Sequence, residues 1–416
     1  MSRIIRVFEY EKLTLTEDSK GRVLTNPELQ KLCDYNDKND NIYFTGIRDG
    51  IKFKNFVGVI QIGGLTLEIL PKADRKETTA ESDFDHWQGA LLRMLALCNH
   101  ISVDSVSETN LKRRYHSLLD LYFNIYLEEV SKLLHQGLIK KYRQQDGQVK
   151  ALKGKLLFTQ QIQQNLVHQE RFYTRHQVYD AEHLHNQILL KALSVLSIVS
   201  NNYSILDKIN RIRLDFPEIK EIEITKAHFD QLKDNRKTVS YKTAIKIAKM
   251  IILNYSPDIK SGGDNMLALL FDMNKLWEEY VYRMLLRSKK DEYEVNFQNN
   301  MKFWEDKTIR PDLVIDRRME DGSTEKYIID TKWKIIDDNH PSDDDLKQMF
   351  AYNMYWEAGK SMLLYPKTKE RDEKFGNFHK KLLPDNKCKL GFIHILDKDG
   401  MLDMKIGDEI LNKLNK

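Results

Sequence analysis

The spacing of apolar residues changes twice along this chain of 416 residues, and this change restricts the possible folds more than any single motif does. Residues 1 to about 75 alternate short apolar runs with turn residues. The pairs Asp49-Gly50 and Gly63-Gly64 separate segments that are rich in Ile, Val, Phe and Thr. This pattern is typical of β-hairpins. We therefore expect a β-rich N-terminal module, built as an antiparallel sheet or a small barrel.

From His86 onward the apolar residues lie three and four positions apart, which indicates amphipathic helices. Gly137 is the expected C-terminal stop of one of them. A cluster of turn-forming residues at 256–265 marks a domain boundary. The expected helices cover residues 87–98, 115–136, 185–201 and 242–254.

Strands and helices alternate over the last 150 residues. A broad apolar stripe predicts a helix over residues 273–288. A polar turn at residues 321–322 joins two of the expected strands. The next helix starts at Ser342 or Asp343 and stops at Gly359, before a buried strand, which gives a β-α-β arrangement. The expected strands cover residues 292–297, 311–316, 326–333, 361–366 and 390–396, and residues 408–416 form a closing helix.

These patterns predict an α+β protein of several domains. Residues 1–80 form the β-rich N-terminal module, and residues 81–262 form a mainly helical middle region with a basic loop. Residues 263–416 form a C-terminal α/β domain with a mixed central sheet.

Composition favours a soluble globular protein. Hydrophobic residues make up 41% of the chain and charged residues 31%, while Gly and Pro total only 26 residues, which favours long regular elements. Cys33, Cys98 and Cys388 lie far apart, so neither a disulfide framework nor a cysteine zinc site is indicated. No apolar run approaches the roughly 18 residues that cross a bilayer. We expect a cytoplasmic protein that is neither secreted nor inserted in a membrane.

Basic residues are in excess upstream. Residues 266–416 contain 27 Lys+Arg and 29 Asp+Glu, a net charge of −2, which leaves +6 for residues 1–265. The basic residues are densest in residues 132–155, which contain the single acid Asp146 and seven basic residues: Lys132, Lys140, Lys141, Arg143, Lys150, Lys153 and Lys155. A basic cluster of this kind can contact DNA phosphates or a partner protein, although a solvated surface is the alternative.

The most informative pattern combines two acids and a lysine. Pro311-Asp312 is followed, eighteen residues after Asp312, by Asp330-Thr331-Lys332. Two hairpin strands would bring Asp312 and Asp330 together, and the period of two places Asp330 and Lys332 on one face of their strand. We therefore expect the three side chains to converge.

These residue types suit phosphodiester hydrolysis. Mg²⁺ (or Mn²⁺) prefers carboxylate oxygens and water, which Asp312 and Asp330 can supply, with the Thr331 carbonyl as a further ligand. Lys332 would orient the attacking water and stabilise the developing phosphate charge. The pattern is short, and a purely structural role is the alternative.

A second pair of polar residues follows on the next helix. Gln348 and Tyr352 lie four positions apart, on a face that could turn toward the site or toward DNA. The alternative is a core role for Tyr352 and a solvated Gln348. His183 and His185 are not expected to bind metal, because no further Cys or His lies at zinc-ligand spacing.

The sequence contains, in order, a helix with Glu, the pair PD, the motif DxK and the motif Qx3Y. In this order of motifs it resembles the RecB-like branch of the PD-(D/E)xK nuclease superfamily. Further segments resemble the McrC family, the nuclease subunits of modification-dependent McrBC restriction systems, and the resemblance spans nearly the whole chain. They are FEY (8–10), FVGVIQIGGLTLEILPK (56–72), LKGKLLFTQQIQQN (152–165), VYDAEHLHNQILLKAL (178–193) and MNKLWEEYV (273–281).

The resemblance implies a division of labour between two chains. A separate McrB-like AAA+ GTPase recognises methylated cytosine sites and translocates double-stranded DNA, while the McrC chain cleaves the DNA and stimulates GTP hydrolysis. The N-terminal region is, by similarity, the part that binds the partner. GTP should be bound by the partner, since this sequence has no GxxxxGK[ST] loop and Gly154-Lys155 is followed by Leu156.

The resemblance also implies the catalytic residues. Asp312, Asp330 and Lys332 match the catalytic positions, and Glu278 matches a helix glutamate of the family. Trp277 replaces the usual Phe, and Glu279 adjoins Glu278, so either glutamate could face the metal. Gln348 and Tyr352 match the extended active-site motif.

Two other functions stay open at this point. The chain could be a stand-alone RecB-like nuclease, although its large region outside the nuclease domain argues against this. It could also be a non-catalytic adaptor that activates a GTPase, although the intact Asp312, Asp330 and Lys332 argue against it.

Overall fold

The computed structural model describes most of the chain. The chain packs into two compact units. Unit 1 comprises residues 3–118 and 270–416, and unit 2 comprises residues 119–269. A compact unit can hold more than one domain, so the division at residues 80 and 262 stays a prediction. The described residues are 3–73, 81–98, 117–233, 235–256, 265–288, 291–336, 340–367, 373–379 and 386–414.

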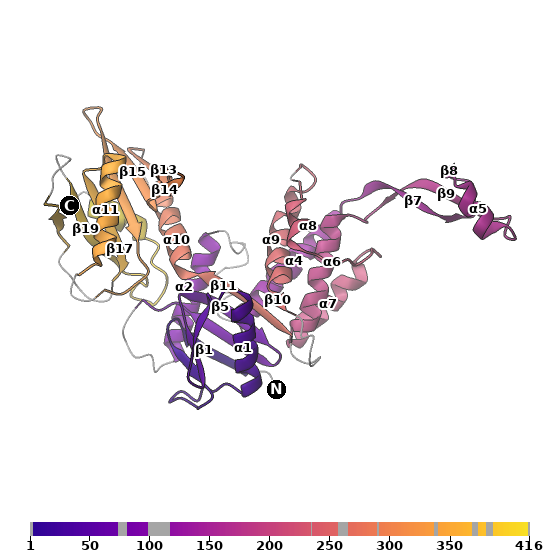
Figure 1. The fold of residues 1–416 in the computed structure, drawn as a ribbon, viewed down its shortest axis with the longest axis horizontal. Helices are drawn as coiled ribbons and strands as arrows, with labels where there is room; N and C mark the ends of the chain where they lie inside the picture. Colours follow the sequence, from indigo (N-terminus) through magenta and orange to yellow (C-terminus); the bar gives the residue numbers. More distant parts are fainter. Residues whose placement is uncertain are drawn as a thin grey trace. The chain divides into compact units, whose positions relative to one another are not determined.

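The N-terminal part of unit 1 is rich in strands, as its sequence predicts (Figure 1). A three-stranded sheet has the order β2-β4-β3, and a second sheet contains β1, β6 and β5 in that order. The β3–β4 and β5–β6 hairpins turn at Asp49 and at Gly63-Gly64, which confirms both hairpin predictions. The bounds are β1 (Arg3–Phe8), β2 (Lys12–Thr14), β3 (Phe44–Ile47), β4 (Gly50–Phe53), β5 (Phe56–Ile62) and β6 (Leu65–Leu70). In unit 2, β10 (Tyr255–Ser256) pairs antiparallel with the start of β11 (Met266–Asp272).

Two features of this module differ from the expectation. Strand β1 pairs with β6 in parallel, so an all-antiparallel sheet was wrong. Local spacing cannot reveal a partner that is distant in sequence. A helix, α1 (Asn26–Lys38), also lies between β2 and β3. Its start carries a signal that was overlooked, because Glu28 accepts a hydrogen bond from the Thr25 backbone N–H as in a capping box.

The expected helices of the middle region are present. Helix α4 ends before Gly137, whose φ of 85° is the left-handed conformation that glycine adopts after a helix. No helix among the described residues has the length and apolar character that crossing a bilayer requires. The bounds are α2 (Glu81–Leu97) in unit 1, and α4 (Leu118–Gln136), α6 (Leu184–Val199), α7 (Tyr203–Asp215), α8 (Lys226–Asp230), η2 (Val239–Tyr241) and α9 (Lys242–Leu253).

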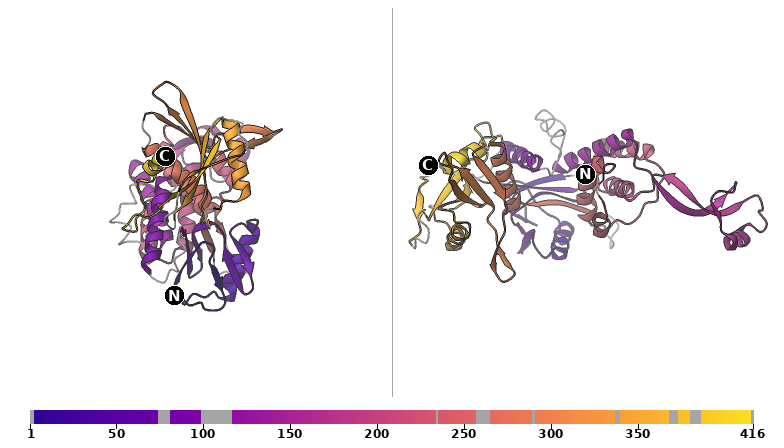
Figure 2. Two further views of the ribbon diagram at one scale, coloured as in Figure 1. Left: turned by 90° about the vertical axis from the view of Figure 1, so that its left-hand side faces the viewer. Right: turned by 90° about the horizontal axis from the view of Figure 1, so that it is seen from above.

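A long β-arm interrupts the helices of unit 2. Strands β7 (Lys141–Val149) and β9 (Phe172–Asp180) pair antiparallel over nine residues each, and the arm also carries β8 (Lys155–Leu156) and α5 (Phe158–Asn165). We call residues 141–180 the β7–β9 arm. It extends away from α6 and α7 of the same unit (Figures 1 and 2). The basic segment expected as a loop is therefore in part a hairpin strand, because residues 141–149 form β7.

The C-terminal part of unit 1 contains a six-stranded mixed sheet. The order is β12-β15-β16-β17-β19-β18, with β16, β17 and β19 parallel and the other pairs antiparallel. The mixed sheet and its β-α-β crossover were expected, whereas the separate β13–β14 hairpin was not. The bounds are α10 (Met273–Ser288), β12 (Tyr293–Phe297), β13 (Met301–Trp304), β14 (Lys307–Ile309), β15 (Leu313–Arg318), β16 (Thr324–Thr331), α11 (Asp343–Trp356), β17 (Lys360–Pro366), β18 (Phe375–Asn377), β19 (Lys387–Ile393) and α12 (Ile406–Leu414).

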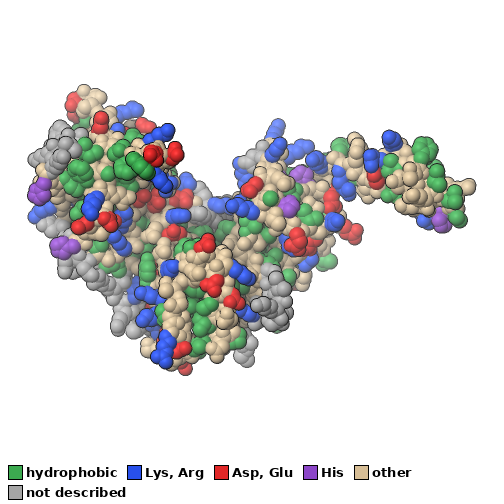
Figure 3. Space-filling view, in the orientation of Figure 1, with side chains coloured by type: hydrophobic (Ala, Val, Ile, Leu, Met, Phe, Trp, Pro, Cys, Tyr) green, Lys and Arg blue, Asp and Glu red, His purple; other side chains and the backbone are tan. Residues whose placement is uncertain are grey.

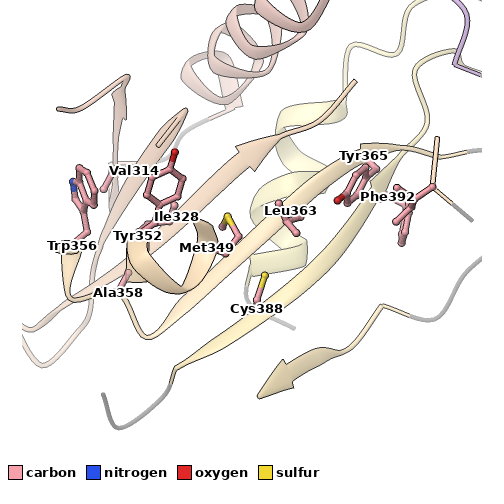
Figure 4. Close-up of a cluster of buried hydrophobic side chains, with 11 residues drawn as sticks. Val314, Ile328, Met349, Tyr352, Trp356, Ala358, Leu363, Tyr365, Cys388 and Phe392 are labelled. Carbon is pink, nitrogen blue, oxygen red and sulfur yellow. The ribbon is translucent and has the colours of Figure 1, made fainter. Parts of the chain in front are cut away.

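Helix α11 packs its apolar face on this sheet. Its start is capped by Ser342, whose hydroxyl accepts a hydrogen bond from the Asp345 backbone N–H, as the sequence predicts. Its end was misplaced by two residues, because Glu357 rather than Gly359 follows the helix in the left-handed conformation (φ 53°). The core beneath it (Figure 4) includes Val314, Ile328, Met349, Tyr352, Trp356, Ala358, Leu363, Tyr365, Cys388 and Phe392.

Candidate active site

Helix α10 places one glutamate at the site. Its apolar stripe is buried, which fixes the rotation of the helix and leaves Glu278 partly exposed on another side. The Glu278 Oε1 atom accepts a hydrogen bond of 2.7 Å from Gln298 Nε2, whereas Glu279 forms an ion pair with Arg283 at 3.2 Å. Of the two adjacent glutamates, Glu278 is therefore the one that lies beside Asp312, whose charge raises its pKa.

Strands β15 and β16 bring the two aspartates together. Leu313 pairs with Ile329, so Asp312 stands just before β15 and Asp330 lies one residue beyond that pair on β16. The Thr331 backbone N–H and hydroxyl donate hydrogen bonds of 2.7 and 2.9 Å to Asp312 Oδ2. These bonds occupy one Asp312 oxygen and fix the carboxylate at the end of the hairpin.

Lys332 lies beside Asp330, as the period of two along a strand predicts. Its Nζ atom is 2.6 Å from Asp330 Oδ2 and 3.6 Å from Asp345 Oδ1, and it donates a hydrogen bond of 3.2 Å to Gln348 Oε1. The ammonium group is thus held between the strand carboxylate and helix α11.

Helix α11 contributes both of its predicted residues. Gln348 Nε2 donates to the Tyr352 hydroxyl at 2.6 Å, and that hydroxyl donates to the Arg310 carbonyl at 2.8 Å. Tyr352 therefore has two roles, because its ring is in the core beneath α11 while its hydroxyl reaches the site. Gln348 is half-buried and links Tyr352 to Lys332.

The site holds its carboxylates at unusual pKa values. Burial, and then the negative charge of Asp312, raise the pKa of Glu278 to about 7. Burial and the same charge raise the pKa of Asp330 to about 7, against the opposing effect of Lys332. Burial also raises the pKa of Asp312. Burial lowers the pKa of Lys332, but the surrounding carboxylates, Asp330 first, outweigh it and leave that pKa raised.

This donor set fits a divalent cation. Among the described residues, no three Asp, Glu, His or Cys side chains converge as a ready-made metal cluster. Mg²⁺, however, is usually held by one or two carboxylates, with water and substrate phosphate as the other ligands. Buried carboxylates that raise one another's pKa are a site whose charge a cation would neutralise. Asp312, Asp330 and the Thr331 carbonyl are therefore suited to hold Mg²⁺ or Mn²⁺.

Comparison with known proteins identifies the family of the chain. The model of the family described as McrBC 5-methylcytosine restriction system component matches residues 51–366, which include all six residues predicted to be catalytic. The chain belongs to this family. No curated protein sequence matches it.

Two solved structures from Thermococcus gammatolerans share the fold. One is a refined half-complex from a tetradecameric assembly of McrB AAA+ hexamers with bound McrC; the match has a TM-score of 0.71 and 18% identity, and covers 99% of each chain. The other is a cryo-EM structure of the McrBC complex, matched with a TM-score of 0.52 and 18% identity over 70% of this chain and 90% of that one. At this identity the matches establish a common fold.

Three residues of the site were overlooked in the sequence. Asp345 is buried and lies 2.6 Å from Lys334 Nζ, next to Lys332. Gln298 joins Glu278 to Arg310, whose Nη1 donates to Gln298 Oε1 at 3.3 Å. Arg310 directly precedes Pro311-Asp312, which was a usable signal. Gln298 carried none, because only the tertiary structure brings it to α10.

The predicted DNA- or partner-binding residues lie in or next to the β7–β9 arm. Arg143 forms an ion pair of 2.8 Å with Asp180 on the paired strand. The other five are exposed and, within the described part of the chain, form no ion pair: Lys140, Lys141, Lys150, Lys153 and Lys155. Figure 3 shows basic and hydrophobic side chains together on the surface of the arm. They lie in unit 2, apart in sequence from the carboxylates of unit 1.

Proposed function

We propose that this chain is the nuclease subunit of a McrBC-type restriction system. It hydrolyses phosphodiester bonds in double-stranded, methylated DNA with Mg²⁺ or Mn²⁺. It acts with a separate McrB-like AAA+ GTPase, which binds the GTP, and it stimulates that partner's GTP hydrolysis. Its C-terminal domain is of the PD-(D/E)xK type.

One observation carries this proposal. Asp312, Asp330 and Lys332 meet at one end of the β15–β16 hairpin, and Gln348 binds the same lysine from α11. A buried group of carboxylates with raised pKa values costs folding free energy, and such groups are concentrated at functional sites.

The side chains divide the chemistry between them. Asp312, Asp330 and the Thr331 carbonyl would hold the cation, which when bound polarises a phosphate oxygen and lowers the pKa of a bound water. Lys332 is held in place by Asp330 and Gln348, so its charge can stabilise the phosphate in the transition state without rearrangement. Glu278, whose pKa is raised to about 7, can accept or deliver a proton at its carboxyl oxygen.

The β7–β9 arm is the proposed contact with the partner or with DNA. Most of its basic residues are exposed, and Lys141 and Arg143 lie on β7, where pairing with β9 keeps the strand regular. Similar chains occur in complexes of McrB hexamers with McrC, which supports a McrB-like protein as the partner. The N-terminal module is a further proposed contact with the same partner.

The test is reconstitution with the candidate GTPase partner. The complex should cleave methylated DNA in the presence of Mg²⁺ and GTP, and unmethylated DNA much less. Asp330→Ala and Lys332→Ala should abolish cleavage while leaving GTPase stimulation intact. Cleavage by this chain alone would instead favour a stand-alone nuclease, and GTPase stimulation without any cleavage would favour an adaptor.

A further inference from the structure

A pocket lies beside the candidate active site, between the β13–β14 hairpin and α11. Its volume is about 520 Å³, within the range of about 300–1,000 Å³ that is common for small-ligand sites. Phe303, Thr308 and Arg310 line it from the hairpin side, and Gln348 and Tyr352 line it from α11. Two residues of the candidate active site are therefore also walls of this pocket.

Arg310 links the pocket to the carboxylates. Its side chain is exposed, and its Nη1 donates to Gln298 Oε1, whose amide donates to Glu278. Its positive charge acts on Glu278 and on Asp312, where it opposes the rise in their pKa values. A guanidinium group pairs well with phosphate. A phosphate bound by Arg310 would therefore lie next to the proposed scissile position.

Phe303 supplies an aromatic surface on the hairpin side of the pocket, the same side as Arg310. Its side chain is 51% exposed, and its ring lies 5.6 Å from that of Tyr355. The Tyr355 hydroxyl also donates to the Phe303 carbonyl at 3.4 Å. Tyr355 lies seven residues after Gln348, so both are on one face of α11. The contact with α11 supports the hairpin, and about half of the Phe303 side chain stays accessible.

The charges of the hairpin indicate which part meets DNA. Its tip carries Glu305 and Asp306, which would repel phosphates. Lys302 and Lys307 flank them. The cation that lies in the pocket itself is Arg310, at the base of the hairpin. DNA is therefore expected at the base of the hairpin, in the pocket, rather than at its tip.

We propose that this pocket binds one nucleotide of the DNA strand being cleaved after its base has left the stack of the duplex, with the base against Phe303 and a phosphate on Arg310. The inference rests on the proposed nuclease function. Stacking of a base on an aromatic ring requires no particular sequence. The pocket would therefore position the strand across Asp312 and Asp330 without reading the bases, leaving sequence recognition to the partner.

The test uses the full chain in complex with its GTPase partner. Phe303→Leu keeps the apolar volume but removes the ring, and Arg310→Gln removes the charge. Trp304→Leu is the matched control, because Trp304 is 62% exposed on the same hairpin but does not line the pocket. Binding of duplex DNA is measured by fluorescence anisotropy with Ca²⁺ replacing Mg²⁺, and cleavage is measured with Mg²⁺. Thermal unfolding of each variant checks its folding.

The expected result is a Kd about fivefold or more higher for Phe303→Leu and for Arg310→Gln, with Trp304→Leu unchanged. On DNA with one abasic position near the cut, Phe303→Leu and the wild type should have the same Kd. On DNA with one neutral methylphosphonate linkage there, Arg310→Gln and the wild type should have the same Kd. Unchanged binding and cleavage in both variants, with Asp330→Ala inactive, would overturn the pocket assignment but keep the nuclease. A wild-type complex that neither binds nor cleaves DNA would overturn both.

Discussion

The candidate active site and the β7–β9 arm hold their charged residues in opposite ways. At the site, Asp330 is only 2% exposed, and burial raises its pKa. On the arm, Arg143 and Arg175 pair across the strands with Asp180 and Asp146 in contact with solvent. The site thus keeps its charge at a cost in folding free energy, whereas the charge of the arm costs little.

This difference shows where function constrains the fold. Buried carboxylates near one another destabilise a protein unless a lysine, a hydrogen bond or a cation compensates. Exposed arm residues can be substituted without affecting the core, so such substitutions should alter binding and leave the stability of the fold unchanged. The four predictions below test this contrast, from the largest expected effect to the smallest.

Replacement of Asp312 should separate activity from stability. Asp312→Asn is expected to lower the DNA cleavage rate by roughly 10²–10³-fold, since a proposed metal ligand is lost. Its melting temperature should stay the same or rise, because the charge that raises the pKa of Glu278 and Asp330 is gone. Asp316→Asn is the matched control, as Asp316 lies on β15, the strand that Asp312 precedes, and its carboxylate is 4.0 Å from Lys326 Nζ. Equal losses of cleavage in both variants would contradict the assignment.

Glu9, a buried carboxylate outside the candidate active site, should control how the free energy of unfolding depends on pH. Glu9 accepts hydrogen bonds from Trp333 Nε1 (2.5 Å) and the Lys72 backbone N–H, and burial raises its pKa to about 8. The folded protein therefore retains a proton that the unfolded chain releases above its usual pKa of about 4.5, so stability falls between these pH values.

Glu9→Gln should remove this part of the pH dependence. Between pH 6 and 8 the variant should gain on the order of 2 kcal/mol of unfolding free energy relative to the wild-type chain. Chemical denaturation at several pH values measures this difference. Glu17→Gln, at an exposed position nearby, is the control and should follow the wild-type profile. Parallel profiles for wild type and Glu9→Gln would show that Glu9 is ionised in the folded state.

Removal of charge from the arm should affect binding alone. Replacement by Ala of Lys141 and Arg143 on the arm, together with the adjacent Lys140, is expected to lower partner GTPase stimulation or DNA affinity about tenfold, with a weaker salt dependence. The melting temperature should change by no more than about 1 °C, since surface substitutions cost little. The control replaces Lys226, Arg236 and Lys237, which are exposed elsewhere in unit 2. Unchanged GTPase stimulation and DNA binding would remove the arm from the proposed interface.

The shape of the arm should matter less than its charge. Gly154 has φ 75°, and a Cβ atom there would lie 2.3 Å from the Arg175 carbonyl oxygen. Gly154→Ala should therefore distort β8 at a local cost of roughly 1–3 kcal/mol and lower partner affinity a few-fold. A Cβ atom at Gly147 would meet no atom within 4 Å, so Gly147→Ala is the control. Limited proteolysis should show faster cleavage of the arm in the first variant only.

Local sequence patterns predicted the regular elements well where one face is buried. The apolar stripe of α10 and the alternating strands β15 and β16 have a period set by contact with a core. The β7–β9 arm was harder to predict, because both faces of β7 are largely exposed and no apolar alternation marks the strand. The β13–β14 hairpin was missed for the same reason.

The candidate site could be predicted only in part. Asp312, Asp330 and Lys332 were identifiable because their spacing suits a hairpin and their chemistry suits a cation. Gln298 and Asp345 were not, since they come from a loop and a helix that only packing brings to the site.

The sequence by itself determined the order of the elements, the acidic and basic residues of the site, and the resemblance to a restriction family. These depend on side-chain chemistry and on periods of two or 3.6 residues, which are local properties. The tertiary structure alone decided that Glu278 rather than Glu279 lies beside Asp312, and that Arg310 and Phe303 line one pocket. Both depend on which face of an element is buried against a distant segment, and that choice is made by the packing of the whole unit.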